Sequence, residues 1–274
     1  MLFLLAGFLF CFSLTWPGVL GMWISMEAAN MILTASFFSF CGLTNRYVGL
    51  LGAVLVGGVS SCLLFLGFLN NSLLLCLFVA ILLKIGMFPF MSWVVSVMIN
   101  MPWATLYFFS SFSKIVVLYF ADYFSCVDVG LVTVTYYATF LFLINYLVFG
   151  LSGFKFLIAL GGVSSGSVGV LLVSRGGLQN AEIFLIFSLL YTALFIWVVQ
   201  SVELGFVSVA DTVFSCFSVL AVPFSVGIVY KIVGASVIVN YGGWFFCWWV
   251  VFSCLETIFV FVWLTEKTSV NEIW

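Results

Sequence analysis

The sequence predicts an all-α integral membrane protein with about ten transmembrane helices, forming a single polytopic domain over residues 1–274. Composition is the first reason, because 66% of the residues are hydrophobic and only 6% are charged. Soluble domains average roughly 45–50% apolar residues and about 25% charged residues. The apolar residues also form continuous runs of about 20 residues, the length of a membrane-crossing helix. A membrane β-barrel would instead alternate in hydrophobicity over segments of about ten residues. The runs therefore predict helices.

The same composition excludes several classes of function. Seven basic and nine acidic residues cannot cover the surface of a water-soluble enzyme, and no basic cluster is present to bind nucleic acid. The absence of histidine removes haem ligation by His, His-based zinc sites and Ser-His catalytic pairs. The eight cysteines are scattered without a C-x-x-C pair, so we expect no redox centre, metal or cofactor in this chain.

Short breaks containing Asn, Gly, Pro or charged residues divide the chain into its expected helices. These are residues 2–22, 24–41, 47–69, 73–99, 103–124, 129–149, 156–173, 183–202, 207–239 and 244–264.

Two of the expected helices, 73–99 and 207–239, are longer than the roughly 20 residues that one crossing needs. Each contains an internal proline, Pro89 and Pro223, and Gly227 follows the second. Pro or Gly at membrane depth interrupts a helix, which is tolerated inside the bundle or beside a cavity. We predict two proline-broken helices, with a simple kink as the alternative at either position.

Small residues are concentrated from Gly161 to Gly169, inside the expected helix 156–173. The run lacks the Gly-Lys-Ser/Thr ending of a phosphate-binding loop. It therefore predicts close packing between helices.

Several ionisable residues lie inside apolar sequence, where they are costly. They are Glu27, Lys84, Lys114, Lys231, Glu256 and, less deeply, Asp211. One ionised lysine at the bilayer centre costs about 2.5–3.5 kcal/mol, so we expect the three lysines to face the protein interior. The alternatives are an interfacial place for Glu27 and static salt bridges for the lysines. The lysines outnumber the deep acids, so they cannot all be neutralised in static pairs. This excess favours lysines that exchange protons.

The remaining charges are expected near the membrane surface, where they indicate orientation. With alternating helices, Arg46, Lys155 and Lys267 share the side of the N-terminus, and Arg175 lies opposite. The positive-inside rule then places the N-terminus in the cytoplasm, or in the matrix of a mitochondrion.

Residues 84–94 read KIGMFPFMSWV and resemble the K-(L/I)-G-x-x-P-F-H-x-W-(V/L)-P signature of the antiporter-like subunits of respiratory complex I. These subunits are related to Mrp-type cation/proton antiporters. Further segments resemble elements of this family in the same order. They are a glutamate segment at 26–31, a membrane lysine at Lys114, a basic stretch at 155–164 and a second proline element at 223–231.

The resemblance implies an antiporter-like bundle in the mitochondrial inner membrane, with the N-terminus on the matrix side. It implies proton translocation through Glu27 paired with Lys84, Lys114 as central relay and Lys231 toward the distal half-channel. Partners would be lipids and other membrane-arm subunits of the complex, including neighbouring antiporter-like subunits. NADH, FMN, iron–sulfur clusters and ubiquinone would belong to other subunits.

The chain departs from the family pattern at its histidines, which are replaced by Met91 and Ser165, and at two prolines, which are replaced by Val95 and Phe224. We therefore expect water and Ser, Thr or Tyr hydroxyls to take the place of a histidine relay. An Mrp-like cation/proton antiporter subunit is the main alternative function. A receptor or structural membrane subunit with static lysine bridges is a third.

Overall fold

The structure, a computed structural model, describes residues 2–16, 18–39, 46–69, 74–120, 127–150, 153–204, 219–220, 223 and 225–271. The described part is mostly helical, with short turns between the helices, and contains no strand. Its elements are α1 (Leu2–Thr15), α2 (Val19–Ala35), the 3-10 helix η1 (Ser36–Ser39), α3 (Arg46–Leu69), α4 (Leu74–Ile85), α5 (Met91–Ile99), α6 (Trp103–Tyr119), α8 (Val129–Phe149), α9 (Phe154–Ser174), α10 (Leu178–Leu204), α12 (Val226–Val239) and α13 (Gly243–Asn271).

The helix bounds follow hydropathy closely in the middle of the chain and less well at its start. Helix α8 has the expected bounds, and α3 begins one residue earlier than expected. The first expected helix, residues 2–22, is wrong, because α1 ends at Thr15 and α2 begins at Val19. Apolar residues continue on both sides of this junction, so hydropathy alone does not mark it.

Among the described residues, five helices are long and apolar enough to cross a membrane. They are α3, α8, α9, α10 and α13, and shorter apolar stretches lie in α1, α4 and α12. These are the features of an α-helical membrane protein. Residues 205–218, including Asp211 and much of the expected helix 207–239, lie outside the described residues.

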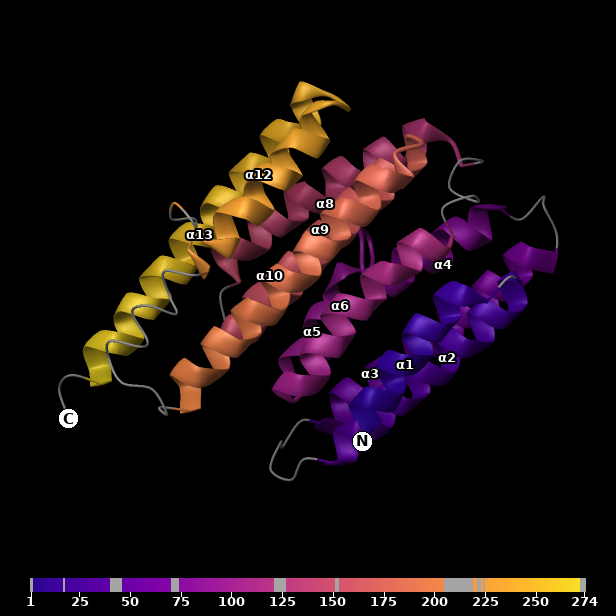
Figure 1. Cartoon of the computed structure of the whole chain (residues 1–274), viewed down its shortest axis with the longest axis horizontal. Helices are drawn as coiled ribbons and strands as arrows, with labels where there is room; N and C mark the ends of the chain where they lie inside the picture. Colours follow the sequence, from indigo (N-terminus) through magenta and orange to yellow (C-terminus); the bar gives the residue numbers. More distant parts are fainter. Residues whose placement is uncertain are drawn as a thin grey trace.

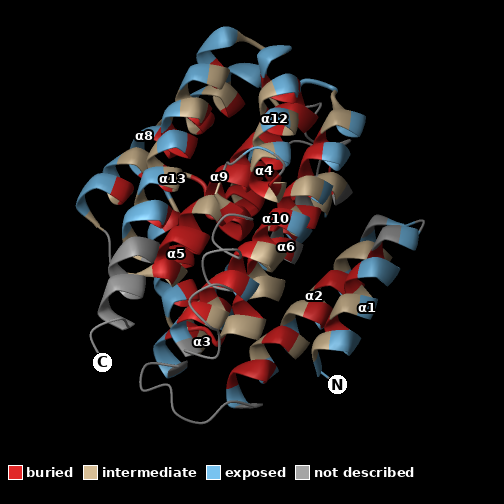
Figure 2. Ribbon diagram, turned by 60° about the vertical axis from the view of Figure 1, so that its left-hand side comes forward, coloured by how far each residue is buried: buried red, intermediate tan, exposed pale blue. Residues whose placement is uncertain are grey.

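The helices lie side by side, with α1, α2 and α3 on one side of the bundle and α12 and α13 on the other (Figure 1). Helix α9 packs against α5, α6, α8 and α10, and nearly all of its residues are buried (Figure 2). The small residues from Gly161 to Gly169 lie in this helix, as expected for close packing. The centre of the bundle is thus a helix surrounded by other helices.

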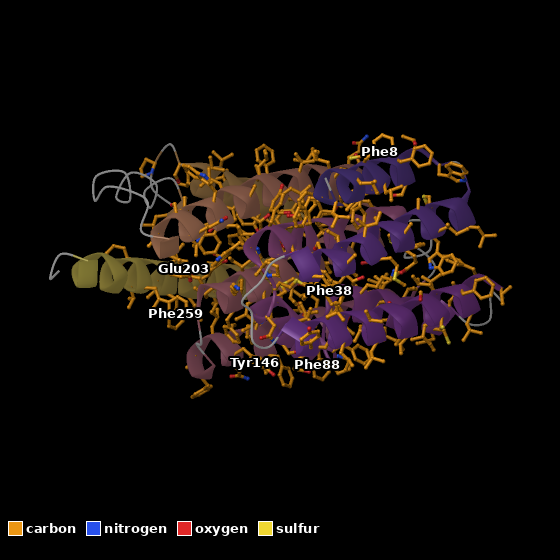
Figure 3. The ribbon with its side chains drawn as sticks, turned by 90° about the horizontal axis from the view of Figure 1, so that it is seen from below. Phe8, Phe38, Phe88, Tyr146, Glu203 and Phe259 are labelled. Atoms are coloured by element: carbon orange, nitrogen blue, oxygen red, sulfur yellow. The ribbon has the colours of Figure 1, made fainter. Side chains whose placement is uncertain are left out.

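The outer faces of the bundle are apolar. Figure 3 shows aromatic side chains along the outside, including that of Phe8 on α1, and Phe149 at the end of α8 is 85% exposed. Soluble monomers rarely expose contiguous apolar surface of this kind. In a bilayer these faces meet lipid, and the buried polar groups inside the bundle become the features that need explanation.

Candidate functional site

Glu27 and Lys84 form an ion pair between α2 and α4, in which Lys84 Nζ donates a hydrogen bond to Glu27 Oε1. Glu27 lies in the middle of α2 and is half-buried. Lys84 is buried in the last turn of α4, where the negative end of the helix dipole also favours an ammonium group. Two residues 57 positions apart therefore form one charge pair inside the bundle.

The first predicted helix break lies directly after Lys84. Helix α4 ends at Ile85 and α5 begins at Met91, with Pro89 between them. Gly86 has a φ of 78°, and a Cβ at this position would collide with the Val94 side chain. The N–H groups of Gly86 and Met87 both donate to the Leu82 carbonyl, at 2.9 and 3.0 Å. The chain thus turns sharply while satisfying its backbone donors.

A cavity of about 60 Å³ lies beside Lys84, between α2, α3, α5 and α6. By volume it has room for about four water molecules. Its walls are mostly aromatic and aliphatic, with a few polar residues. The polar lining residues other than Lys84 are Asn30, Thr34, Ser60, Trp93 and Thr105. The indole N–H of Trp93 is buried and has no hydrogen-bond partner within the described part of the chain, so it is a donor available to water.

Lys114 lies on α6 and is 1% exposed, and its Nζ has no hydrogen-bond partner among the described residues. Ser110 and Ser111 lie about one helical turn earlier on the same side of α6. The hydroxyl of Ser111 is 3.5 Å from that of Thr192 on α10. Lys114 is therefore a buried ammonium donor next to a small group of hydroxyls.

Lys231 lies on α12, half-buried, and its Nζ donates to the carbonyl of Ser253 on α13 at 2.8 Å. Ser225 caps the start of α12, where its Oγ accepts from the N–H of Ile228. Gly227 is buried against the carbonyl of Val219, a place that no larger residue could take without displacement.

Pro223, the second predicted break, lies in a turn just before α12. Most of the residues expected to form the helix before this turn lie outside the described residues. The structure therefore shows the helix that follows the predicted break.

Glu256 is a functional candidate to which the sequence assigned no role. It lies on α13, is 6% exposed and is within electrostatic reach of both Lys114 and Lys231. The three side chains are all described, and neither lysine forms a direct ion pair with the carboxylate. The signal in the sequence was its depth in an apolar helix, which does not reveal neighbours on other helices.

Lys155, expected near the membrane surface, joins α9 to the segment between α5 and α6. Its Nζ donates to the Met101 carbonyl at 2.7 Å and lies 5.2 Å from the centre of the Trp103 ring. A cavity of about 180 Å³ lies beside it, with Glu203 also in its wall. These contacts are those of a residue that holds helix ends together.

The structure thus divides the predicted site residues into two groups. Glu27 and Lys84 form one, with Pro89 five residues after Lys84, and Lys114 and Lys231 form the other, both within electrostatic reach of Glu256. In the described part of the chain, no three His, Cys, Asp or Glu side chains form a group that could hold a metal ion.

Comparison with known proteins adds no assignment. No family model matches the chain, and no curated protein matches it significantly.

Proposed function

We propose that this chain is a non-redox, proton-translocating subunit of NADH:ubiquinone oxidoreductase, corresponding to subunit 2 in the membrane arm of mitochondrial complex I. The observation that carries the proposal is Lys114, a buried lysine whose Nζ has no hydrogen-bond partner among the described residues. A static structural lysine would be expected to have a paired anion or a bonded carbonyl. A lysine that accepts and releases protons needs neither in its resting state.

The Glu27–Lys84 pair supports the proposal by giving such a relay a control point. While the pair is closed, the carboxylate stabilises the Lys84 ammonium by attraction. Separation of the pair would leave that ammonium alone in a low-dielectric interior and would favour passage of its proton onward. The cavity beside Lys84 has room and polar groups for water that could carry it.

We further infer that the described helices belong to ten membrane crossings in an antiporter-like arrangement, with the N-terminus in the matrix. Helix α12 has 14 residues and spans about 21 Å, less than the roughly 30 Å of a hydrocarbon core. It fits the second half of a crossing interrupted near Pro223, as α5 fits the second half of one interrupted at Pro89. In this proposal, other subunits bind NADH, FMN, iron–sulfur clusters and ubiquinone, and neighbouring membrane-arm subunits and lipids cover the outer faces.

Two measurements test this function. Native electrophoresis of mitochondrial membranes with an in-gel NADH-oxidation stain should find the chain in the large NADH-oxidising complex. Its presence only in a small complex, with sodium-dependent proton release, would instead establish the antiporter alternative.

Lys114→Met should lower the number of protons pumped per NADH oxidised by the assembled complex. Arg175→Gln is the matched control, because Arg175 is exposed after the end of α9. Unchanged pumping in both Lys114→Met and Lys84→Met would contradict proton transfer and leave the lysines a structural role.

A further inference from the structure

The carboxylate of Glu256 faces the centre of the bundle. A Cβ built at Gly161 on α9 would lie 3.0 Å from Glu256 Oε1. Helix α9 packs against both α13 and α6, and is itself almost fully buried. Glu256 therefore packs against Gly161 of the central helix, where the absence of a side chain leaves room for the carboxylate.

Two lysines on different helices lie within electrostatic reach of this carboxylate. Lys231 is held at α13 by its bond to the carbonyl of Ser253, about one turn before Glu256. Lys114 lies on α6, and the charge of Glu256 acts on both lysines. One carboxylate cannot neutralise both the buried Lys114 and the half-buried Lys231, so at least one amine is left without a full counter-charge or without its proton.

A cavity of about 10 Å³ lies in front of Glu256, with room for about one water molecule. Its polar lining residues besides Glu256 are Ser164, Ser165, Tyr191, Thr192 and Tyr230. The hydroxyls of Ser164 and Ser165 donate to the carbonyl of Gly161, at 2.9 and 2.8 Å. Their oxygen lone pairs are therefore available to accept a hydrogen bond.

The cavity has a polar connection toward each lysine. On one side, Thr192 is 3.5 Å from Ser111, which lies about one turn from Lys114. On the other side, Tyr230 precedes Lys231 directly in α12, and its ring stacks on that of Tyr191 at a centroid distance of 4.8 Å. Hydroxyl groups thus extend from the turn of α6 before Lys114, through the cavity, to Tyr230 on α12.

We propose that Glu256 is a proton-relay residue between Lys114 and Lys231, acting through this cavity. The Lys114 ammonium gives one proton to the Glu256 carboxylate, which leaves a neutral amine and a carboxylic acid. The acid then gives that proton to a neutral Lys231 amine, which restores the carboxylate and forms the Lys231 ammonium. Charge and protons are conserved in each step. The proposal rests on the proposed function and adds to it a residue that the sequence pattern leaves without a role.

Glu256→Gln tests the relay, because the amide keeps the shape of the side chain and cannot carry a proton in this exchange. We expect the variant complex to oxidise NADH and to lose the same share of pumped protons per NADH as Lys114→Met. Glu256→Asp keeps the carboxylate and should retain part of that share. Glu182→Gln is the control, because Glu182 is exposed on α10. Full pumping by Glu256→Gln would overturn the proposal.

Two neighbouring glycines give a second test that leaves the glutamate in place and is decisive if Glu256→Gln fails to assemble. Gly161→Ala introduces a methyl group 3.0 Å from Glu256 Oε1, whereas a methyl group at Gly162 would be 3.7 Å from Met98 and 3.8 Å from Ser110, in ordinary contact. We expect Gly161→Ala to lower the proton-to-NADH ratio and Gly162→Ala to leave it unchanged. Equal ratios in the two variants would count against the relay.

The two failures can be distinguished by including Lys114→Met in the same series. If Lys114→Met lowers pumping and Glu256→Gln does not, the relay through Glu256 is wrong and the proposed function stands. If neither substitution changes pumping and Lys84→Met also leaves it unchanged, the proposed function itself is wrong.

Discussion

Lys231 and Ser253 are joined by a hydrogen bond of 2.8 Å from the lysine Nζ to the serine carbonyl, which ties α12 to α13. Thr257 shares this carbonyl, at 3.1 Å. Lys114 differs, because its Nζ has no such bond to any described residue. The two lysines on which the charge of Glu256 acts are thus held in different ways, and this difference leads to separable effects on stability and transport.

Lys114→Met should leave the stability of the protein unchanged or raise it by about 1–3 kcal/mol, because it removes an unsatisfied buried donor and keeps the side-chain length. Proton pumping should fall in the same variant. Thermal unfolding of the purified complex, measured beside the proton-to-NADH ratio, checks both effects. A clear loss of stability would show that Lys114 has a structural partner.

Lys84→Met should destabilise the protein, because it leaves Glu27 without its counter-charge inside the bundle. We expect the free energy of unfolding to fall by about 3 kcal/mol. This is the lower end of the range for breaking a buried ion pair, because Glu27 is half-buried. The double variant Glu27→Gln with Lys84→Met should recover part of this loss. Additive losses in a double-mutant cycle of unfolding free energies would mean that the two residues are not coupled.

Gly86→Ala should destabilise the first helix break. The residue has a φ of 78°, which costs a side-chain-bearing residue about 1–2 kcal/mol, and its Cβ would also meet the Val94 side chain. Gly58→Ala, inside α3 with open space around the added Cβ, should instead stabilise by about 0.5–1 kcal/mol. Thermal midpoints of the two variants should therefore move in opposite directions.

Thr192→Val should slow proton pumping without unfolding the protein, because it removes a hydroxyl that lines the Glu256 cavity and keeps the side-chain shape. Loss of one hydrogen-bonding group worth about 1 kcal/mol corresponds to roughly a fivefold lower rate. Thr139→Val is the control, because Thr139 is buried on α8 and bonds only to carbonyls of its own helix, so far as the structure describes them. Equal rates in the two variants would exclude the Thr192 hydroxyl from the path.

Much of the fold could be read from the sequence, because lipid imposes long apolar helices and short breaks. The bounds of α8 and the break at Pro89 follow from hydropathy and from the chemistry of proline. The junction after Thr15 was missed, since apolar residues lie on both sides of it. Hydropathy marks a turn only where the turn is polar.

The sequence identified most residues of the site, but it predicted only some of the contacts between them. Depth in apolar sequence identified Glu27, Lys84, Lys114 and Lys231 as costly charges, and a family resemblance suggested the first pair. The grouping of Glu256 with two of the lysines depends on how α6 and α13 pack against α9 and how α12 packs against α13. Lys114 and Glu256 are more than a hundred positions apart in sequence, and Lys231 and Glu256 lie on different helices, so no local pattern encodes this grouping.

The burial of α9 has a consequence for how substitutions in it are tolerated. A helix with one lipid-facing side accepts larger apolar residues every three or four positions along that side. Helix α9 has protein on every side over almost its whole length. Positions that tolerate a larger side chain should therefore not recur every three or four residues in α9. Larger side chains should be accepted more easily on the outer helices of the bundle than on this central one.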